Sequence, residues 1–178
     1  QVYNPKAVVS VMQRGVFRSY WSKTGTYASI LPLISMDFDG LQEDVIRLLA
    51  GESCSVETAS FQNDLNIVRS KDDVLTSLIH LGYLSYDREQ RTCHIPNREV
   101  ATEFKNAIVS DSNWGIVATA IQQSEQLLKV TLDAKEEVVA AAIDAIHSDA
   151  TSVLQYNDEN SLACVLTLAY YTSQKDYL

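Results

Sequence analysis

The adjacent residues Cys93 and His94 are of types that could do chemistry together, since thiolates and imidazoles are common zinc ligands. They fall on an expected β-strand, where neighbouring side chains point to opposite faces, so they cannot easily serve one metal. His80 and His147 lie on expected helices, and neither has a second ligand at helical spacing. We therefore interpret all four residues as structural and expect no metal site in this chain.

Three acidic pairs, at 72–73, 136–137 and 158–159, all fall in the first turn of an expected helix. Carboxylates there interact favourably with the positive end of the helix dipole, which explains the first two pairs adequately. Glu159 is different, because a glutamate at the start of an apolar helix could also reach a metal held by groups elsewhere. It is the one weak catalytic candidate.

The stronger catalytic and cofactor motifs are missing from the sequence. There is no GxxxxGK[ST] phosphate loop, and no GxSxG, HExxH or CxxC. No residue cluster supplies a nucleophile, a base and an orienting group together. We expect that the chain binds no cofactor and is not an enzyme by itself.

Charge disfavours nucleic acid as a partner. The 178 residues include 14 Lys or Arg and 23 Asp or Glu, a net charge of −9. Residues 1–100 have a net charge of −2 and residues 101–178 a net charge of −7, and no run of Lys or Arg occurs. A chain this acidic is repelled by phosphate unless a basic patch is concentrated somewhere.

Other features of the composition indicate a compact, soluble, cytoplasmic protein. The apolar runs are short and interrupted by charge, so neither a signal peptide nor a membrane span is expected. The three cysteines are an odd number at wide spacings, which favours reduced, buried thiols over a disulfide framework. The chain does not begin with Met, which suggests a fragment of something longer.

The segment 70–100 predicts a helix, a hairpin and a second helix in order. Ser70 can cap a helix together with Asp73, and Gly82 ends that helix about three turns later. Two short strands flank the polar turn at 87–91, and Asn97 caps the next helix. This order is typical of a winged-helix-like module.

The remaining elements are mostly helices. The patterns predict a helix before Gly15, an apolar helix over 27–36 that Pro32 must kink or split, and a helix over 41–50 capped by Asp39. A short strand is expected within 53–61, and helices over 98–109, 114–121, 124–132, 134–147 with Asp133 as its cap, and 159–173 capped by Asp158. The fold class is therefore mainly α with a small β-hairpin, a helical bundle with a winged-helix-like module. The polar run at 110–113 divides it into domains at 1–110 and 111–178.

The winged-helix-like module has a poor surface for DNA. The helix before the hairpin, which enters the major groove in DNA-binding modules, offers Lys71 alone, followed by two aspartates. Residues 70–100 contain four basic and five acidic side chains. Arg88, Arg91 and Arg98 are the only plausible phosphate contacts, so a role in contacting protein is favoured.

Three sets of short motifs occur in a characteristic order along nearly the whole chain: Tyr3-Asn4-Pro5 with Tyr20-Trp21 and Thr24-Gly25-Thr26, then Leu81-Gly82-Tyr83-Leu84 with Ile95-Pro96-Asn97-Arg98-Glu99-Val100, then Tyr156-Asn157-Asp158-Glu159-Asn160 with Leu168-Ala169-Tyr170-Tyr171. Together they resemble a bacterial family in which an AAA-ATPase-like domain is followed by a PD-(D/E)XK-type nuclease domain.

The resemblance implies that this chain is the middle of a larger protein. Residues 1–110 would be a lid-like region of the ATPase, and 111–178 the helical lead-in to a truncated nuclease-like core. ATP and Mg²⁺ are then expected only for the parent protein, because the phosphate loop would precede residue 1 and the nuclease aspartate and Glu-X-Lys pair would follow residue 178. Only Glu159 matches a position that could join the nuclease site.

We thus expect a non-catalytic regulatory or connecting region that mediates contacts between domains or between proteins. Its partners would be other domains of the same polypeptide or another protomer, with no membrane involved. The alternative is a winged-helix-type nucleic-acid-binding module that places the three arginines on phosphates.

Overall fold

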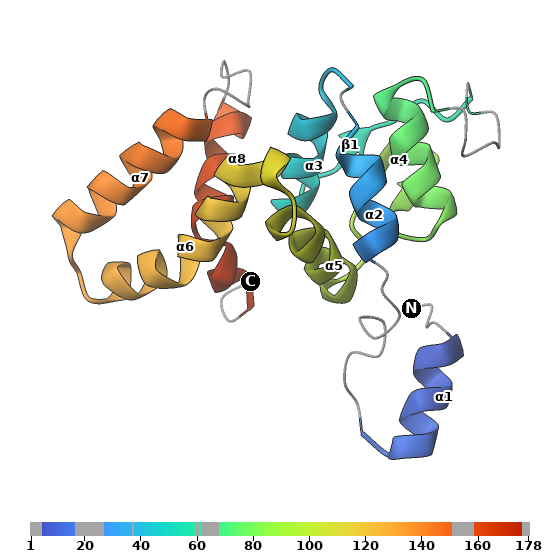
Figure 1. Ribbon diagram of the computed structural model, residues 1–178, viewed down its shortest axis with the longest axis horizontal. Coiled ribbons are helices and arrows are strands. Elements are labelled where there is room, and N and C mark those ends of the chain that lie inside the picture. Colours follow the sequence, from blue (N-terminus) through green and yellow to red (C-terminus); the bar gives the residue numbers. More distant parts are fainter. Residues whose placement is uncertain are drawn as a thin grey trace.

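The computed structural model describes residues 5–16, 27–36, 38–59, 61, 68–150 and 159–175. Helices dominate these residues, with one small sheet, which confirms the fold class that the sequence predicts (Figure 1). The elements in chain order are α1 (Pro5–Arg14), α2 (Tyr27–Ile34), α3 (Leu41–Leu49), β1 (Cys54–Ser55), α4 (Lys71–His80), β2 (Ser85–Asp87), β3 (Thr92–His94), α5 (Arg98–Val109), the short 3-10 helix η2 (Ser112–Trp114), α6 (Gly115–Leu132), α7 (Glu136–Ala150), α8 (Glu159–Ala169) and the 3-10 helix η3 (Tyr171–Lys175).

Local capping sets the bounds of α4 and α5 as the sequence predicts. The Ser70 hydroxyl accepts from the Asp73 amide at 3.2 Å, and the Asp73 carboxylate accepts from the Arg69 amide at 2.9 Å. Gly82 follows α4 with φ +82°, a left-handed conformation that glycine adopts without steric cost. The Asn97 side chain accepts from the Val100 amide at 3.0 Å and so begins α5.

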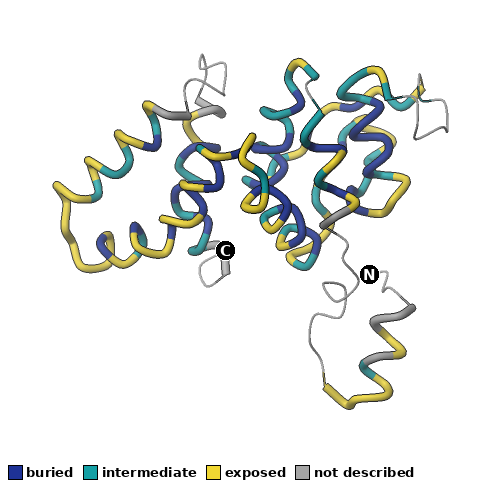
Figure 2. The backbone as a smooth tube through the Cα atoms, in the orientation of Figure 1, coloured by how far each residue is buried: buried dark blue, intermediate teal, exposed yellow. Residues whose placement is uncertain are grey.

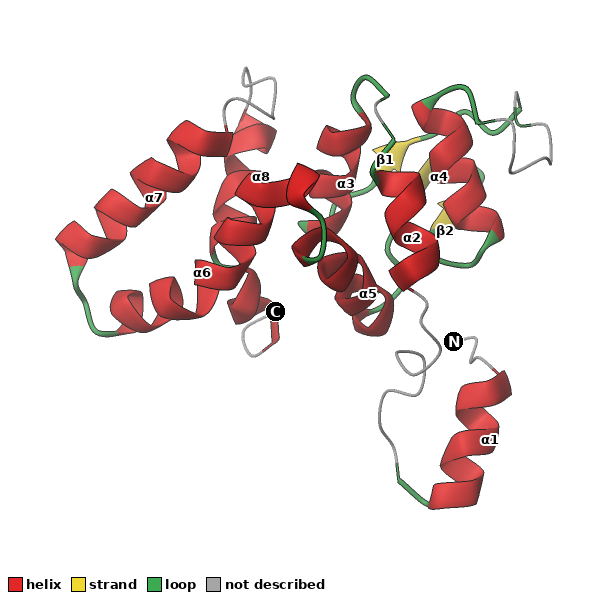
Figure 3. Cartoon of the chain, viewed as in Figure 1, coloured by secondary structure: helices red, strands yellow, loops and turns green. Residues whose placement is uncertain are grey.

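The sheet is antiparallel with strand order β1-β3-β2 (Figure 3). The hairpin pairs Tyr86 with Cys93, as expected around the turn at 87–91. The short strand expected within 53–61 is β1, and it adds to the far edge of β3, where Cys54 lies opposite Cys93. Together, α4, the β2–β3 hairpin and the preceding strand β1 form a winged-helix-like arrangement.

Pro32 is exposed within α2, which continues to Ile34, so of the kink or the split that the sequence allows, the split does not occur. Three of the sequence expectations on helix limits are wrong in detail. The cap of α3 is Gly40 in the left-handed region, with no side-chain bond from Asp39. The predicted break between 121 and 124 does not occur, because exposed glutamines continue the polar face of one long helix, α6. Asp133 is the C-terminal cap of α6 rather than the start of α7, and Ala134 follows it with φ +55°.

One connected core of buried apolar side chains runs from α2 to η3. Its largest fully buried members are Trp114 and Phe104, with Ile30, Ile34, Leu41, Ile46, Leu48, Leu75, Leu78, Ile108 and Ile121. α5 packs on both α2 and α6, and α3 contacts α8, where the Cys164 thiol donates to the Glu52 carboxylate at 3.1 Å. The division into domains at 1–110 and 111–178 stays a prediction.

One helix lies away from this core. α1 stands apart from the other helices in Figure 1, and its described side chains are mostly exposed in Figure 2. α6 and α7 both contribute to the core, but the connection between them is fully exposed. No helix in the described part of the chain is long and apolar enough to cross a membrane.

Candidate functional site

The structure separates the three arginines that the sequence singles out. Arg88 and Arg91 share the exposed turn of the hairpin, before β3, whereas Arg98 begins α5, after β3. The Arg91 guanidinium lies 3.6 Å from the Glu57 carboxylate, and both side chains are largely exposed. An exposed ion pair of this kind contributes little to stability. The negative charge of Glu57 nevertheless weakens the attraction between Arg91 and a phosphate. The role of the three arginines as phosphate contacts stays a prediction.

The helix α4, which corresponds to the groove-reading helix of DNA-binding winged helices, is enclosed. Residues 73–78 are all buried, including the polar side chains of Asp73, Thr76 and Ser77. Its first turn is tied to α3 by Lys71 Nζ, 2.8 Å from the Asp44 carboxylate. Such a helix cannot present a row of side chains to the edges of DNA bases unless it separates from the elements packed around it.

Only part of this burial follows from the sequence. The spacing predicts an apolar face made of Val74, Leu75, Leu78, Ile79 and Leu81, but the Leu81 side chain is 42% exposed and follows the helix. Thr76 and Ser77 were not expected inside, yet Ser77 is fully buried and donates its hydroxyl to the Asp73 carbonyl at 2.7 Å. The Thr76 hydroxyl is also buried, but it has no hydrogen-bond partner among the described residues.

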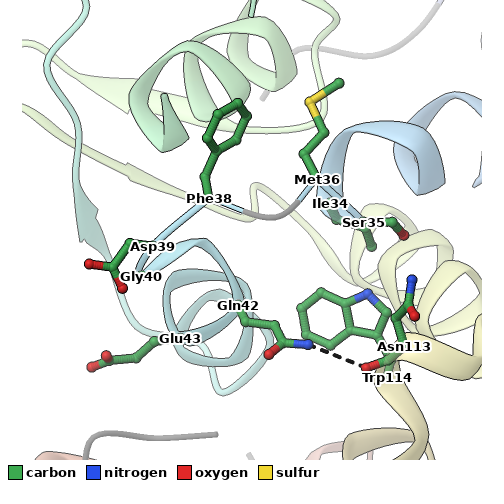
Figure 4. Close-up of a pocket in the computed structure, with 10 residues that line it drawn as sticks. All are labelled: Ile34, Ser35, Met36, Phe38, Asp39, Gly40, Gln42, Glu43, Asn113 and Trp114. Carbon is green, nitrogen blue, oxygen red and sulfur yellow. Dashed lines mark hydrogen bonds between the residues drawn. The ribbon is translucent and has the colours of Figure 1, made fainter. Parts of the chain in front are cut away.

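A cleft of about 530 Å³ lies where the end of α2, the start of α3 and η2 meet (Figure 4). This volume is within the range of small-molecule and side-chain pockets. The described residues that line it are Ile34, Ser35, Met36, Phe38, Asp39, Gly40, Gln42, Glu43, Asn113 and Trp114. They combine apolar and aromatic side chains with carboxylates, and none of these described residues is Lys or Arg.

Hydrogen bonds hold the walls of the cleft together. The Ser35 hydroxyl at the end of α2 donates to the Asp111 carboxylate, which also accepts from the Asn113 amide at 3.0 Å. Gln42 Nε2 on α3 donates to the Asn113 carbonyl at 3.3 Å, which Figure 4 shows as a dashed line. The bond from Ser35, and then that from the Asn113 amide, lower the pKa of Asp111 below the usual value of an aspartate.

Trp114 belongs both to the lining of the cleft and to the hydrophobic core. Its side chain is 1% exposed, and the buried indole N–H has no partner among the described residues. Figure 4 shows the indole ring beside Gln42 and Asn113. Because Trp114 and Ile34 are buried, the exposed part of the lining is mainly polar, and the exposed carboxylate of Asp39 lies at the rim.

The cysteines and histidines do not form a site. Cys93 is fully buried and His94 is exposed, as the alternation along a strand predicts. Burial raises the pKa of the Cys93 thiol to about 12 and raises the pKa of Cys54 as well. The His80 ring stacks on Phe61, with centroids 5.3 Å apart. No group of three potential ligands in the described part of the chain is arranged to hold a metal.

Several residues of the proposed family motifs lie outside the described residues, namely those at 3–4, 20–21, 24–26 and 156–158. Glu159 begins α8, but its side chain is not among those described. Its candidacy for a nuclease site stays a prediction.

The cleft is the feature that sequence analysis missed. Its lining comes from 34–43 and from 113–114, which are far apart in the chain and lack a shared motif. The polar run at 110–113 was interpreted as a boundary, although its aspartate and asparagine are the groups that join α2 and α3 to η2. A large aromatic residue directly after such a polar run is the one local signal that could have indicated it.

Comparisons of this chain with family models, with curated proteins and with solved structures found no match.

Proposed function

We propose that this chain is a non-catalytic connecting or regulatory region that works by binding other protein surfaces. The enclosure of α4 is the observation that carries the proposal. The one helix that could read DNA is packed inside the fold, and its buried hydroxyls and carboxylate face other residues instead of solvent.

Charge and surface chemistry support the same function. Arg88, Arg91 and Arg98 are the candidates for phosphate contacts within residues 70–100, and one of them, Arg91, lies near the Glu57 carboxylate. The cleft, in contrast, has the carboxylates of Asp39 and Glu43 and no Lys or Arg among its described lining residues, which suits a basic protein segment. Nucleic acid binding by this module is therefore the less favoured function.

The family resemblance extends the proposal to a parent protein. In this view the parent is an ATPase-nuclease that uses ATP and Mg²⁺, and this chain transmits movement between its parts through apolar helix faces. Its partners are other domains of the same polypeptide or another protomer. The proposal sets the protein in the cytoplasm, where three free cysteines stay reduced.

Fluorescence anisotropy with labelled duplex and single-stranded oligonucleotides at low salt tests the proposed function. We expect no binding to either nucleic acid, and no difference between the wild type and an Arg88→Ala, Arg91→Ala variant. Binding that weakens steeply with salt and disappears in the double variant would favour the nucleic-acid alternative instead.

Thermal unfolding gives the complementary test of docking. A chain extended through the nuclease-like core that the resemblance implies is expected to unfold at a higher temperature than residues 1–178, with slower amide exchange in α8. Equal unfolding temperatures and equal exchange would contradict docking on that side.

A further inference from the structure

Two cysteines, Cys54 and Cys93, lie directly opposite each other on the antiparallel strands β1 and β3. Directly opposite residues have Cα atoms about 4.5 to 5.5 Å apart and side chains on the same face of the sheet. Both cysteines are buried, at 4% and 0% exposure, while their neighbours Ser55 and His94 are exposed. The two thiols therefore point into the same part of the core.

The spacing of the two strands is suitable for a disulfide bond. Disulfides usually join residues whose Cα atoms are about 4.4 to 6.8 Å apart, a range that includes directly opposite residues of an antiparallel pair. Both cysteines are free thiols in this structure, and the Cys54 thiol donates to the Asp44 carbonyl at 3.4 Å. A thiol is a weak donor, so little stability is lost when this hydrogen bond is exchanged for a covalent bond.

Access to the two thiols depends on β1. Burial raises the pKa of the Cys93 thiol to about 12 and raises the pKa of Cys54 as well, so neither thiol reacts readily while the sheet is closed. β1 lies at the edge of the sheet, however, and its two residues pair with Cys93 and Thr92. Short edge elements open locally at a lower free energy than the whole fold. Such opening exposes both thiols to a small oxidant.

We propose that Cys54 and Cys93 are a redox modification site, at which glutathione disulfide forms a reversible bond that links β1 to β3. This inference does not rest on the proposed function. In a reducing compartment the pair remains as thiols, and the link forms only when glutathione disulfide accumulates.

The reaction consists of two successive thiol–disulfide exchanges. The Cys54 thiolate attacks one sulfur of glutathione disulfide, whose S–S bond breaks and releases one glutathione thiolate. The Cys93 thiolate then attacks the Cys54 sulfur, forms the new disulfide and releases the second glutathione. The protein loses two electrons and two protons, which leave in two molecules of reduced glutathione.

The link has a consequence for the winged-helix-like module. Cys54 precedes α4 and Cys93 follows β2, so the disulfide closes a loop that contains both elements. A cross-link between residues far apart in the chain stabilises a fold mainly by restricting the unfolded chain. The oxidised module should therefore open less often than the reduced module.

Peptide mapping of the full chain after incubation in glutathione buffers, from fully reduced to fully oxidised, tests the proposal. Free thiols are blocked with N-ethylmaleimide in urea, and the chain is digested with trypsin without reduction and analysed by mass spectrometry. We expect one linked pair of peptides, which contain Cys54 and Cys93, whereas Cys164 remains unlinked. Dithiothreitol should release both peptides.

Thermal unfolding measures the effect of the link. The oxidised chain should unfold at a temperature at least about 5 °C higher than the reduced chain. Amide exchange in β1 and β3 should also be slower. Cys164→Ala is the matched control, because it removes a buried thiol of α8, outside the sheet, and it should leave the link and the temperature shift unchanged. Cys54→Ala should abolish both.

Three outcomes would overturn this inference. They are absence of the Cys54–Cys93 link in the most oxidising buffer, links to Cys164 that are equally frequent, and a linked chain that unfolds at a lower temperature than the reduced chain. All three are measured on the wild type, so they do not depend on whether Cys54→Ala folds. None of them bears on the proposed function, which the oligonucleotide titration tests separately.

Discussion

Thr76→Val is expected to stabilise the protein, because it removes a buried hydroxyl that has no hydrogen-bond partner. Thr76 is 2% exposed in the middle of α4. Leaving such a group unpaired costs about 1–3 kcal/mol. Valine has nearly the same shape and helix propensity, and the new methyl group adds up to about 0.8 kcal/mol of burial. We expect the free energy of unfolding to rise by about 1–2 kcal/mol.

Urea unfolding followed by circular dichroism measures this change. The transition midpoint should rise while the slope stays the same, since the surface exposed on unfolding hardly changes. A gain of this size also raises the melting temperature by roughly 2–4 °C per kcal/mol. Thr102→Val on α5 is the matched control, because that hydroxyl is exposed and donates to the Arg98 carbonyl at 2.8 Å. It should change stability by less than about 0.5 kcal/mol.

Two results would refute the reasoning. If Thr76→Val lowers the free energy of unfolding, the hydroxyl has a partner or is hydrated, and the cost assigned to an unpaired buried group is wrong. If both threonine variants behave alike, burial of the unpaired hydroxyl is not the cause of the change.

Ser35→Ala should destabilise the protein most near neutral pH. Its hydroxyl lowers the pKa of Asp111, so the stabilisation is present above the unfolded-state pKa and is lost as the pH falls through the folded-state pKa. Cys93 should resist iodoacetamide in the native protein and react in urea, because its raised pKa leaves almost no thiolate at neutral pH. Gly82→Ala should cost about 1–2 kcal/mol, since φ is +82° there. Gly115→Ala, at an ordinary φ with open space, should be neutral or stabilising by up to about 1 kcal/mol.

Each of these expectations has a contradicting result. A cost of Ser35→Ala that is constant from neutral to acid pH would show that the hydroxyl does not act through the Asp111 carboxylate. Rapid native alkylation of Cys93, identified by mass spectrometry, would show that β3 opens readily. Equal urea midpoints for Gly82→Ala and Gly115→Ala would exclude backbone strain at the end of α4.

Local interactions explain which elements could be predicted from the sequence. Ser70, Asn97 and Gly82 act within four residues of their own position, so their roles follow from neighbouring residue types. The hairpin turn at 87–91 is equally local. The mainly helical fold class follows from the sum of such signals.

Tertiary contacts explain what could not be predicted. Burial of Thr76 and Ser77 depends on how the rest of the fold surrounds α4, and nothing in their own segment distinguishes them from a polar helix face. The cleft depends on Ser35 meeting Asp111, residues 76 positions apart. Polar side chains at 122–123 suggested a break because a continuous polar face and a loop look alike over two residues.

The addition of β1 to the edge of β3 has a consequence for how this protein folds. The β2–β3 hairpin can form early, because its strands are joined by a short turn. Pairing of Ser55 with Thr92 must instead close a long loop that contains α4, and the entropy of that closure delays it. We therefore expect β1 to pair with β3 after the β2–β3 hairpin has formed. α4 is then fully enclosed only when β1 has paired.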